Sequence, residues 1–81
     1  MEYPKLWKNE GNVLTRTFTF NNFIESVKFI DKLVPLSEEL KHHPDIDLFS
    51  YKNVKIKLST HESGEITKKD IEFASRINEI T

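Results

Sequence analysis

Apolar and polar residues recur with strand or helix periodicity along the chain, and the first two such segments predict a strand followed by a helix. Residues 13–20 are rich in Val, Thr and Phe, a composition typical of a β-strand. Asn21 or Asn22 can then cap a helix, with Glu25 in the capping-box position after Asn22. The apolar residues that follow at helical spacing predict one buried stripe, made of Phe23, Ile24, Val27, Ile30, Leu33 and Val34.

Two prolines affect the middle of the chain. Pro35 lacks a backbone donor, so it is expected either to kink the helix or to open a second one. Good helix formers follow it up to the triplet His42-His43-Pro44, where Pro44 disfavours the helical conformation for His43. The helix is therefore expected to end close to this pair of histidines.

A β-hairpin is predicted for residues 47–59, with Lys52-Asn53 as a two-residue turn. Apolar residues alternate with polar ones in its second arm, which is typical of a strand with one covered face. In this register the aromatic residues of the first arm, Phe49 and Tyr51, would lie opposite apolar residues of the second arm. The hairpin would then present an apolar face to the helices.

The end of the chain predicts one more helix. Thr67 is the expected N-cap, and Asp70 stands at the third helical position, as in a capping box. Ile71, Ala74 and Ile77 mark its inward stripe. The order strand, helix, strand, strand, helix predicts an α+β fold, a two-layer sandwich whose antiparallel sheet has helices packed on one face.

Length and composition restrict the class of protein. Eighty-one residues are enough for a single domain, residues 1–81, with a modest core. The chain has no cysteine, so disulfides cannot reinforce that core, and a homodimer or homotetramer is a reasonable expectation. Twelve basic and thirteen acidic residues give a net charge of −1, which does not favour direct binding to nucleic acid.

The chain shows no sign of a membrane or secretory segment. Charged residues interrupt its start, which argues against a signal peptide, and no apolar run is long enough to span a membrane. A cytoplasmic protein is expected. Lys52, Lys55 and Lys57 form a small basic patch, interpreted as the solvated face of an edge strand rather than as a phosphate site.

Three histidines provide candidate chemistry. His42 and His43 stand at the expected end of a helix, and His61 stands just beyond an expected strand. Imidazole has an ordinary pKa of about 6.5, so it can give and take protons near neutrality. Taken singly, each histidine has a structural explanation, as do Glu38 on a helix surface and Asp70 in a cap.

Taken together, these residues form a longer pattern. At fixed intervals along the chain stand Glu38, His42-His43-Pro44, Tyr51, His61 and Asp70. The pattern resembles the signature of the pterin-4a-carbinolamine dehydratases, a family known also as the dimerisation cofactor of a homeodomain transcription factor. Trp7, the Phe-rich segment 18–23 and the run LSTHESGEIT also match the family, so the likeness covers nearly the whole chain. Lys41 replaces an Asn or Asp, and Glu65 replaces a second glycine, that family members often have.

The resemblance implies an enzyme that dehydrates a 4a-hydroxytetrahydropterin to a quinonoid dihydropterin, in the recycling of tetrahydrobiopterin. It implies His42 and His61 as the acid and base, His43 as a pterin-binding residue, and no metal or organic cofactor. Spacing adds that Glu38, four residues before His42, could orient its ring. Asp70, near a helix start, could accept a hydrogen bond from His61.

Two other classes of protein stay open. Animal members of the family also stabilise the dimer of a transcription factor, so a non-enzymatic interaction module is the alternative. Three histidines could also bind zinc, although the adjacent His42 and His43 are poorly placed to share one tetrahedral site. No metal site is expected.

Overall fold

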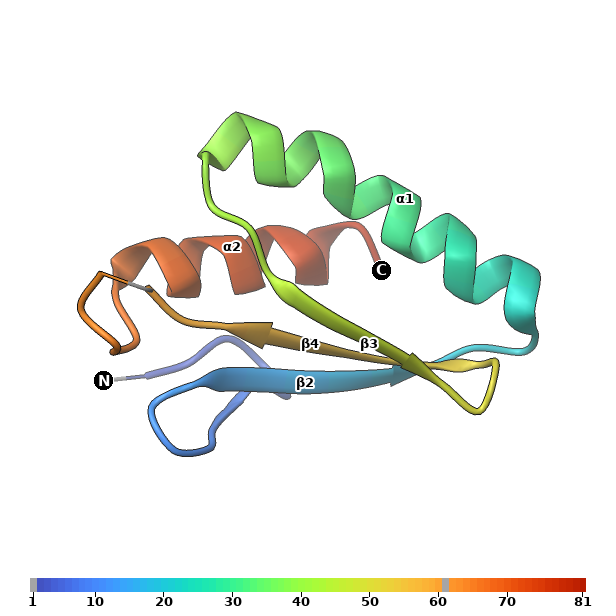
Figure 1. Cartoon of the computed structure of the whole chain (residues 1–81), viewed down its shortest axis with the longest axis horizontal. Coiled ribbons are helices and arrows are strands. Elements are labelled where there is room, and N and C mark those ends of the chain that lie inside the picture. Colours follow the sequence, from blue (N-terminus) through green and yellow to red (C-terminus); the bar gives the residue numbers. More distant parts are fainter. Residues whose placement is uncertain (1, 61) are drawn as a thin grey trace.

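The computed structural model describes residues 2–60 and 62–81. Its elements in chain order are β1 (Lys8–Asn9), β2 (Leu14–Thr19), α1 (Phe23–Leu40), β3 (Asp45–Phe49), β4 (Asn53–Leu58) and α2 (Lys68–Glu79). The strands form one antiparallel sheet in the order β1-β2-β4-β3, and both helices lie on the same face of it (Figure 1). The predicted α+β architecture is confirmed. The short strand β1 was not expected, because the first residues carry no alternating pattern.

Helix α1 begins where the capping signal places it and runs through its proline without interruption. The Asn22 side chain accepts a hydrogen bond from the backbone N–H of Glu25 at 2.8 Å. Pro35 lies inside the helix. The missing backbone donor costs one hydrogen bond, but Leu33 and Leu36 on either side are buried in the core and hold the helix together.

The predicted buried stripe of α1 is wrong in most of its members. Phe23, Ile24, Val27 and Val34 are exposed, and the buried side chains are Ser26, Phe29, Leu33, Leu36 and Ser37. The helix carries apolar residues on two faces, so periodicity alone could not select one. Two serines on the buried face donate to backbone carbonyls, Ser26 to Asn22 at 3.0 Å and Ser37 to Leu33 at 2.7 Å. Local bonds of this kind let small polar residues be buried without penalty.

The predicted register of the hairpin is also wrong. Phe49 pairs with Asn53 instead of Ile56, and the turn includes Ser50 and Tyr51, whose φ angles are 49° and 54°. Three residues, Ser50 to Lys52, connect the paired Phe49 and Asn53, and positive φ angles in such turns are usually supplied by Gly or Asn. An odd shift in register moves side chains to the other face, so Phe49 and Tyr51 are exposed.

Strand β4 lies between β2 and β3, so it is a central strand and not an edge strand. Its residues Val54, Ile56 and Leu58 are fully buried beneath the helices. Lys55 and Lys57 alternate with them and project from the uncovered face of the sheet. The interpretation of the lysines as edge-strand residues is therefore corrected.

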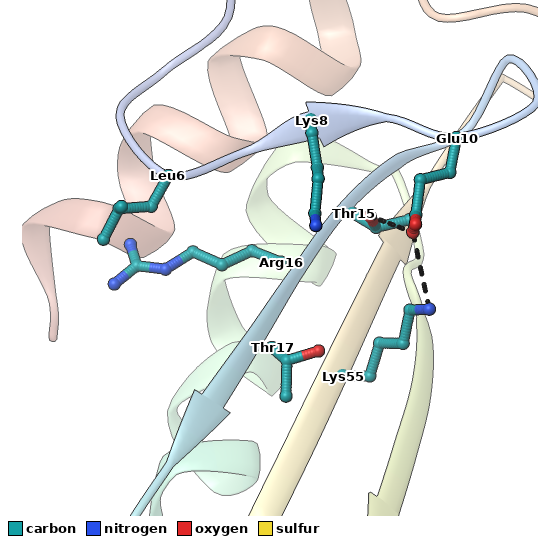
Figure 2. A pocket seen from close by; sticks show the side chains of 7 residues that line it. All are labelled: Leu6, Lys8, Glu10, Thr15, Arg16, Thr17 and Lys55. Atoms are coloured by element: carbon teal, nitrogen blue, oxygen red, sulfur yellow. Dashed lines mark hydrogen bonds and ion pairs between the residues drawn. The ribbon is translucent and has the colours of Figure 1, made fainter.

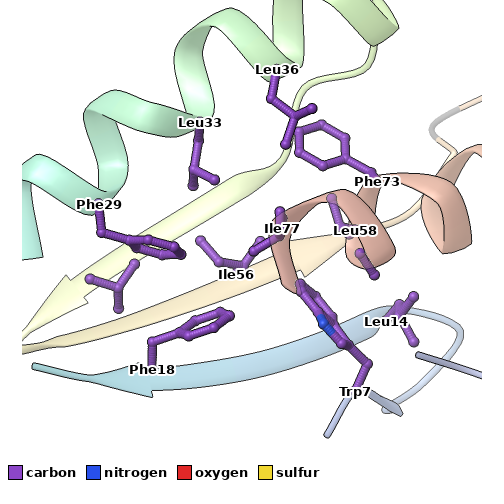
Figure 3. Close-up of a cluster of buried hydrophobic side chains, with 12 residues drawn as sticks. Trp7, Leu14, Phe18, Phe29, Leu33, Leu36, Ile56, Leu58, Phe73 and Ile77 are labelled. Carbon is purple, nitrogen blue, oxygen red and sulfur yellow. The ribbon is translucent and has the colours of Figure 1, made fainter. Parts of the chain in front are cut away.

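The core fills the space between the sheet and both helices (Figure 3). Its members are Trp7, Leu14, Phe18, Phe29, Leu33, Leu36, Val54, Ile56, Leu58, Phe73, Ala74 and Ile77. Trp7 donates from Nε1 to Asn78 Oδ1 at 2.8 Å, which ties the N-terminal segment to the last turn of α2. Phe73 is fully buried one turn after the start of the same helix. These contacts fix α2 and thereby the position of Asp70.

No helix within residues 2–60 and 62–81 is both long and apolar enough to cross a membrane.

Candidate active site

His42 lies just beyond the C-terminal end of α1, where the chain turns inward. Lys41 adopts the left-handed conformation, with φ 52° and ψ 43°, and ends the helix. The backbone N–H of His42 then donates to the carbonyl of Ser37 at 3.1 Å, which is the usual way to satisfy a carbonyl at a helix end. The His42 residue is 8% exposed, and its ring lies 6.2 Å from the ring of Phe73.

Asp70 binds the inward-facing ring of His42. His42 Nε2 lies 2.5 Å from Asp70 Oδ1, and Asp70 is 0% exposed. The second carboxylate oxygen, Oδ2, accepts from the backbone N–H of Thr67 at 2.9 Å and from Thr60 Oγ1 at 3.1 Å. A buried carboxylate is stable only with such partners. The network therefore joins three segments: the end of α1, the residues after β4 and the start of α2.

His43 has a different environment from its neighbour. Its Nε2 lies 2.8 Å from Glu38 Oε2, and the two side chains are 69% and 70% exposed. Successive residues are not expected to share a direction, and these two histidines do not. The pair is open to solvent, so its contribution to the free energy of folding is small.

One expected side-chain pairing differs from that in the structure, and a second involves a residue that the structure does not describe. Glu38 was expected to orient His42, but it contacts His43, because the left-handed Lys41 breaks the helical spacing before His42 is reached. Asp70 was expected to accept from His61; in the structure its Oδ1 lies against His42 Nε2, and the pairing with His61 is not tested. His61 lies outside the described residues, so its predicted role stays a prediction.

A small pocket of about 200 Å³ adjoins the exposed pair. It lies between α1 and the start of β3 and is lined by Ile30, Leu33, Val34, Ser37, Glu38, His43, Pro44 and Ile46. Its walls are mainly apolar, with a few polar side chains. Mainly apolar walls with a few polar groups are the usual composition of small-molecule sites.

A larger cavity of about 320 Å³ lies on the uncovered face of the sheet, near β1 (Figure 2). None of the predicted site residues lines it. Glu10 accepts from Thr15 Oγ1 at 2.7 Å and lies 3.4 Å from Lys55 Nζ. The hydrogen bond from Thr15 and the charge of Lys55 lower the pKa of Glu10. These polar groups are largely paired with one another, so size alone does not make this cavity the site.

The structure adds Thr60 and Thr67 to the residues around the histidines. The capping signal identified Thr67, but no sequence signal pointed to Thr60. Tyr51, a member of the sequence pattern, is 59% exposed in the turn after β3, at the opposite end of that strand from His42. Within residues 2–60 and 62–81, no group of three or more His, Cys, Asp or Glu side chains could hold a metal ion.

Comparison with known proteins gives the family. The family model described as pterin 4 alpha carbinolamine dehydratase matches residues 2–80, and the chain belongs to this family. A protein of Sulfolobus acidocaldarius, provisionally named as such a dehydratase, is 47% identical over 91% of this chain and 80% of its own length. A protein of Trichormus variabilis with the same provisional name is 45% identical over 91% of this chain and 78% of its own.

Two solved structures share the fold. A protein of Brucella melitensis described as a transcriptional coactivator/pterin dehydratase superposes with a TM-score of 0.86 and 29% identity, over 94% of this chain and 82% of that one. A pterin dehydratase-like protein described as a RuBisCO assembly factor in the alpha-carboxysome gives a TM-score of 0.72 and 27% identity, over 91% and 84% of the two chains.

Proposed function

We propose that this protein is a 4a-hydroxytetrahydropterin dehydratase in which His42 and His61 carry the protons. The observation that supports this most strongly is the buried pair of His42 and Asp70 in a chain of the pterin dehydratase family. A histidine held by a buried carboxylate at the end of a helix is an arrangement suited to acid–base chemistry. The pathway of tetrahydrobiopterin recycling and the cytoplasmic location are part of the same proposal.

The reaction requires two proton transfers. The hydroxyl group on C4a leaves as water after it gains a proton, and the proton on N5 is removed, so that the product is the quinonoid dihydropterin. Each positioned proton transfer contributes about 10²–10⁴-fold to the rate. His42 serves as one of the two proton carriers and His61 as the other, with Asp70 holding the ring of His42.

His43 is proposed to bind the pterin rather than to move protons. In support, it lines the mainly apolar pocket beside α1 together with Glu38. His43→Ala is therefore expected to raise KM while changing kcat by less than about threefold, since a binding group acts equally on ground and transition states. A kcat that fell by more than tenfold with an unchanged KM would assign His43 to the chemical step.

The decisive experiment is a stopped-flow absorbance assay with enzymatically generated hydroxypterin. Wild type should accelerate the dehydration, and His42→Ala and His61→Ala should each lower kcat at least tenfold, within the range lost with one acid or base. His61→Ala should also leave the free energy of unfolding within about 1 kcal/mol. A wild-type protein that does not exceed the spontaneous rate would refute the proposal.

An interaction module is the second candidate function. It is favoured by the descriptions of the two structural neighbours as a coactivator and an assembly factor, and by the exposed apolar residues along α1. Capture of a protein partner without pterin turnover would favour the module.

The same apolar residues of α1 support a homodimer or homotetramer. Light scattering at micromolar concentration should show a multiple of the monomer mass, and a monomer alone would remove this expectation.

A further inference from the structure

The hydroxyl groups around Asp70 can donate in only one satisfactory order. Thr60 Oγ1 lies 2.6 Å from Thr67 Oγ1 and 3.1 Å from Asp70 Oδ2. Each hydroxyl has one proton, so if Thr60 donates to Asp70, Thr67 must donate to Thr60. The reverse order would require Thr67 to reach Asp70 across 3.5 Å, which is a poor hydrogen bond. The order is therefore Thr67 to Thr60 to Asp70.

The carboxylate held in this way faces His42 and sets where the hydrogen of the ring lies. Asp70 Oδ2 receives two donors, Thr60 Oγ1 and the backbone N–H of Thr67. An ionised carboxylate only accepts, so the hydrogen between Asp70 Oδ1 and His42 Nε2 belongs to the ring. In neutral His42 the lone pair is then on Nδ1. Within the described part of the chain, the only side-chain hydrogen bond of the ring is the one from Nε2 to Asp70.

The backbone around Thr60 keeps its hydroxyl in place. The N–H of Thr60 donates to the carbonyl of Glu65 at 3.0 Å, and the carbonyl of Thr60 accepts from Gly64 at 2.8 Å. Thr60 and Glu65 form an isolated β-bridge between the residues after β4 and the start of α2. Because both backbone groups are engaged, the side chain of Thr60 is a fixed donor to Asp70.

We propose that Thr60 is a positioning residue. Its hydroxyl holds Asp70 so that His42 stays in the tautomer with the hydrogen on Nε2 and the lone pair on Nδ1. Thr60 acts through Asp70 and does not touch the substrate. The effect on turnover rests on the proposed function, whereas the effect on the tautomer does not.

The test compares two variants at position 60 with a matched control at position 67. Thr60→Val keeps the shape and removes the hydroxyl, and Thr60→Ser keeps the hydroxyl. Thr67→Val removes the donor to Thr60 but leaves Thr60 free to donate to Asp70, and the backbone N–H of Thr67 is retained. The first readout is the ¹⁵N chemical shift of both ring nitrogens of His42, recorded at a pH high enough that the ring signals no longer change.

Wild type, Thr60→Ser and Thr67→Val should all show His42 with the hydrogen on Nε2. Thr60→Val should show a mixture of tautomers. In the pterin assay, Thr60→Val should lower kcat at least fivefold with KM within twofold, while Thr60→Ser stays within twofold of wild type. A wild-type His42 with its hydrogen on Nδ1 would overturn the proposal without any variant. A Thr60→Val protein with an unchanged tautomer would overturn it as well.

The two proposals fail in different ways. A wild-type protein without turnover removes the proposed function, and the chemical shifts still decide whether Thr60 sets the state of His42. A Thr60→Val protein that loses turnover but keeps the wild-type tautomer would show that Thr60 acts by another route, and the positioning role would be rejected. If Thr60→Val does not fold, the wild-type tautomer and the comparison with Thr67→Val decide the question.

Discussion

The chain contains two histidine–carboxylate pairs with similar contact distances, one buried and one exposed. Their contributions to the free energy of unfolding can therefore be compared to isolate the effect of burial. His42 and Asp70 are 2.5 Å apart and buried, and His43 and Glu38 are 2.8 Å apart and exposed. Removal of one partner from a buried pair leaves an unpaired buried polar group and costs about 3–5 kcal/mol. An exposed pair is worth about 0–1 kcal/mol. His42→Ala should therefore lower the free energy of unfolding by about 3–5 kcal/mol and His43→Ala by less than about 1 kcal/mol.

Urea unfolding followed by circular dichroism measures this difference. In thermal unfolding, a change of 1 kcal/mol corresponds to about 4–8 °C in Tm for a chain of this length. The Tm of His42→Ala should therefore lie at least about 12 °C below that of wild type. Asp70→Ala and the double variant His42→Ala/Asp70→Ala complete a double-mutant cycle. The loss of the helix cap made by Asp70 is common to both and cancels in the coupling free energy. The coupling free energy should be about 1.5–3 kcal/mol, the value of a hydrogen bond to a charged group. Measurements at several protein concentrations exclude a contribution from self-association.

Equal losses for His42→Ala and His43→Ala would refute this reasoning, as would a coupling free energy near zero. Either result would mean that water reaches Asp70 in the variant and replaces the ring at little cost. An unchanged m-value is required as the control, since a change would show that the unfolded or folded state itself has altered.

Three further predictions follow from single residues. Lys41→Gly should raise the free energy of unfolding by about 0.5–1 kcal/mol. The reason is that relief of the left-handed conformation of Lys41, worth about 1–2 kcal/mol, exceeds the cost of the extra chain entropy of glycine. A urea midpoint at or below that of wild type would contradict this prediction. The lowered pKa of Glu10 means that its stabilising contribution is present above the ordinary glutamate range and is lost as pH falls through the folded-state pKa. Glu10→Gln should therefore make stability less dependent on pH in acid, by a small and salt-sensitive amount, and identical pH profiles would refute this. Val27→Asp, on the exposed face of α1, should lower the mass measured by light scattering while the circular dichroism spectrum is kept; an unchanged oligomer would exclude this face as the interface.

Local signals in the sequence were sufficient for the elements that depend on local chemistry. Helices α1 and α2 begin directly after their N-cap residues, Asn22 and Thr67, because the capping interactions lie within the first helical turn. Strand β2 follows from its content of Thr and Phe. The position of Lys41 also has a local explanation, since Asn and Asp, which family members often have there, tolerate the left-handed conformation that the structure requires. The replaced glycine at Glu65 is less serious, because the positive φ of this loop falls on Gly64 among the described residues.

The features that sequence could not supply depend on contacts between distant segments. Helix α1 has apolar residues with helical spacing on two faces. Packing against the sheet and α2 decides which of these faces is buried. The hairpin register was decided by an unusual turn at Ser50 and Tyr51, without Asn or Gly at its centre. The partner of Asp70 was missed because the break at Lys41 rotates His42 away from Glu38, and no helical spacing rule extends across such a break.

Asn78 gives the last turn of α2 a connection to the beginning of the chain. Its side-chain oxygen accepts from Trp7 and Arg16, and its nitrogen donates to the carbonyl of Lys5 at 3.1 Å. The helix that carries Asp70 is thus anchored at both ends, although none of these anchoring residues belongs to the histidine pattern. Transfer of the His42–Asp70 pair to another scaffold would therefore require the N-terminal segment through Trp7 as well, or other contacts that fix the C-terminal end of α2 in the same way.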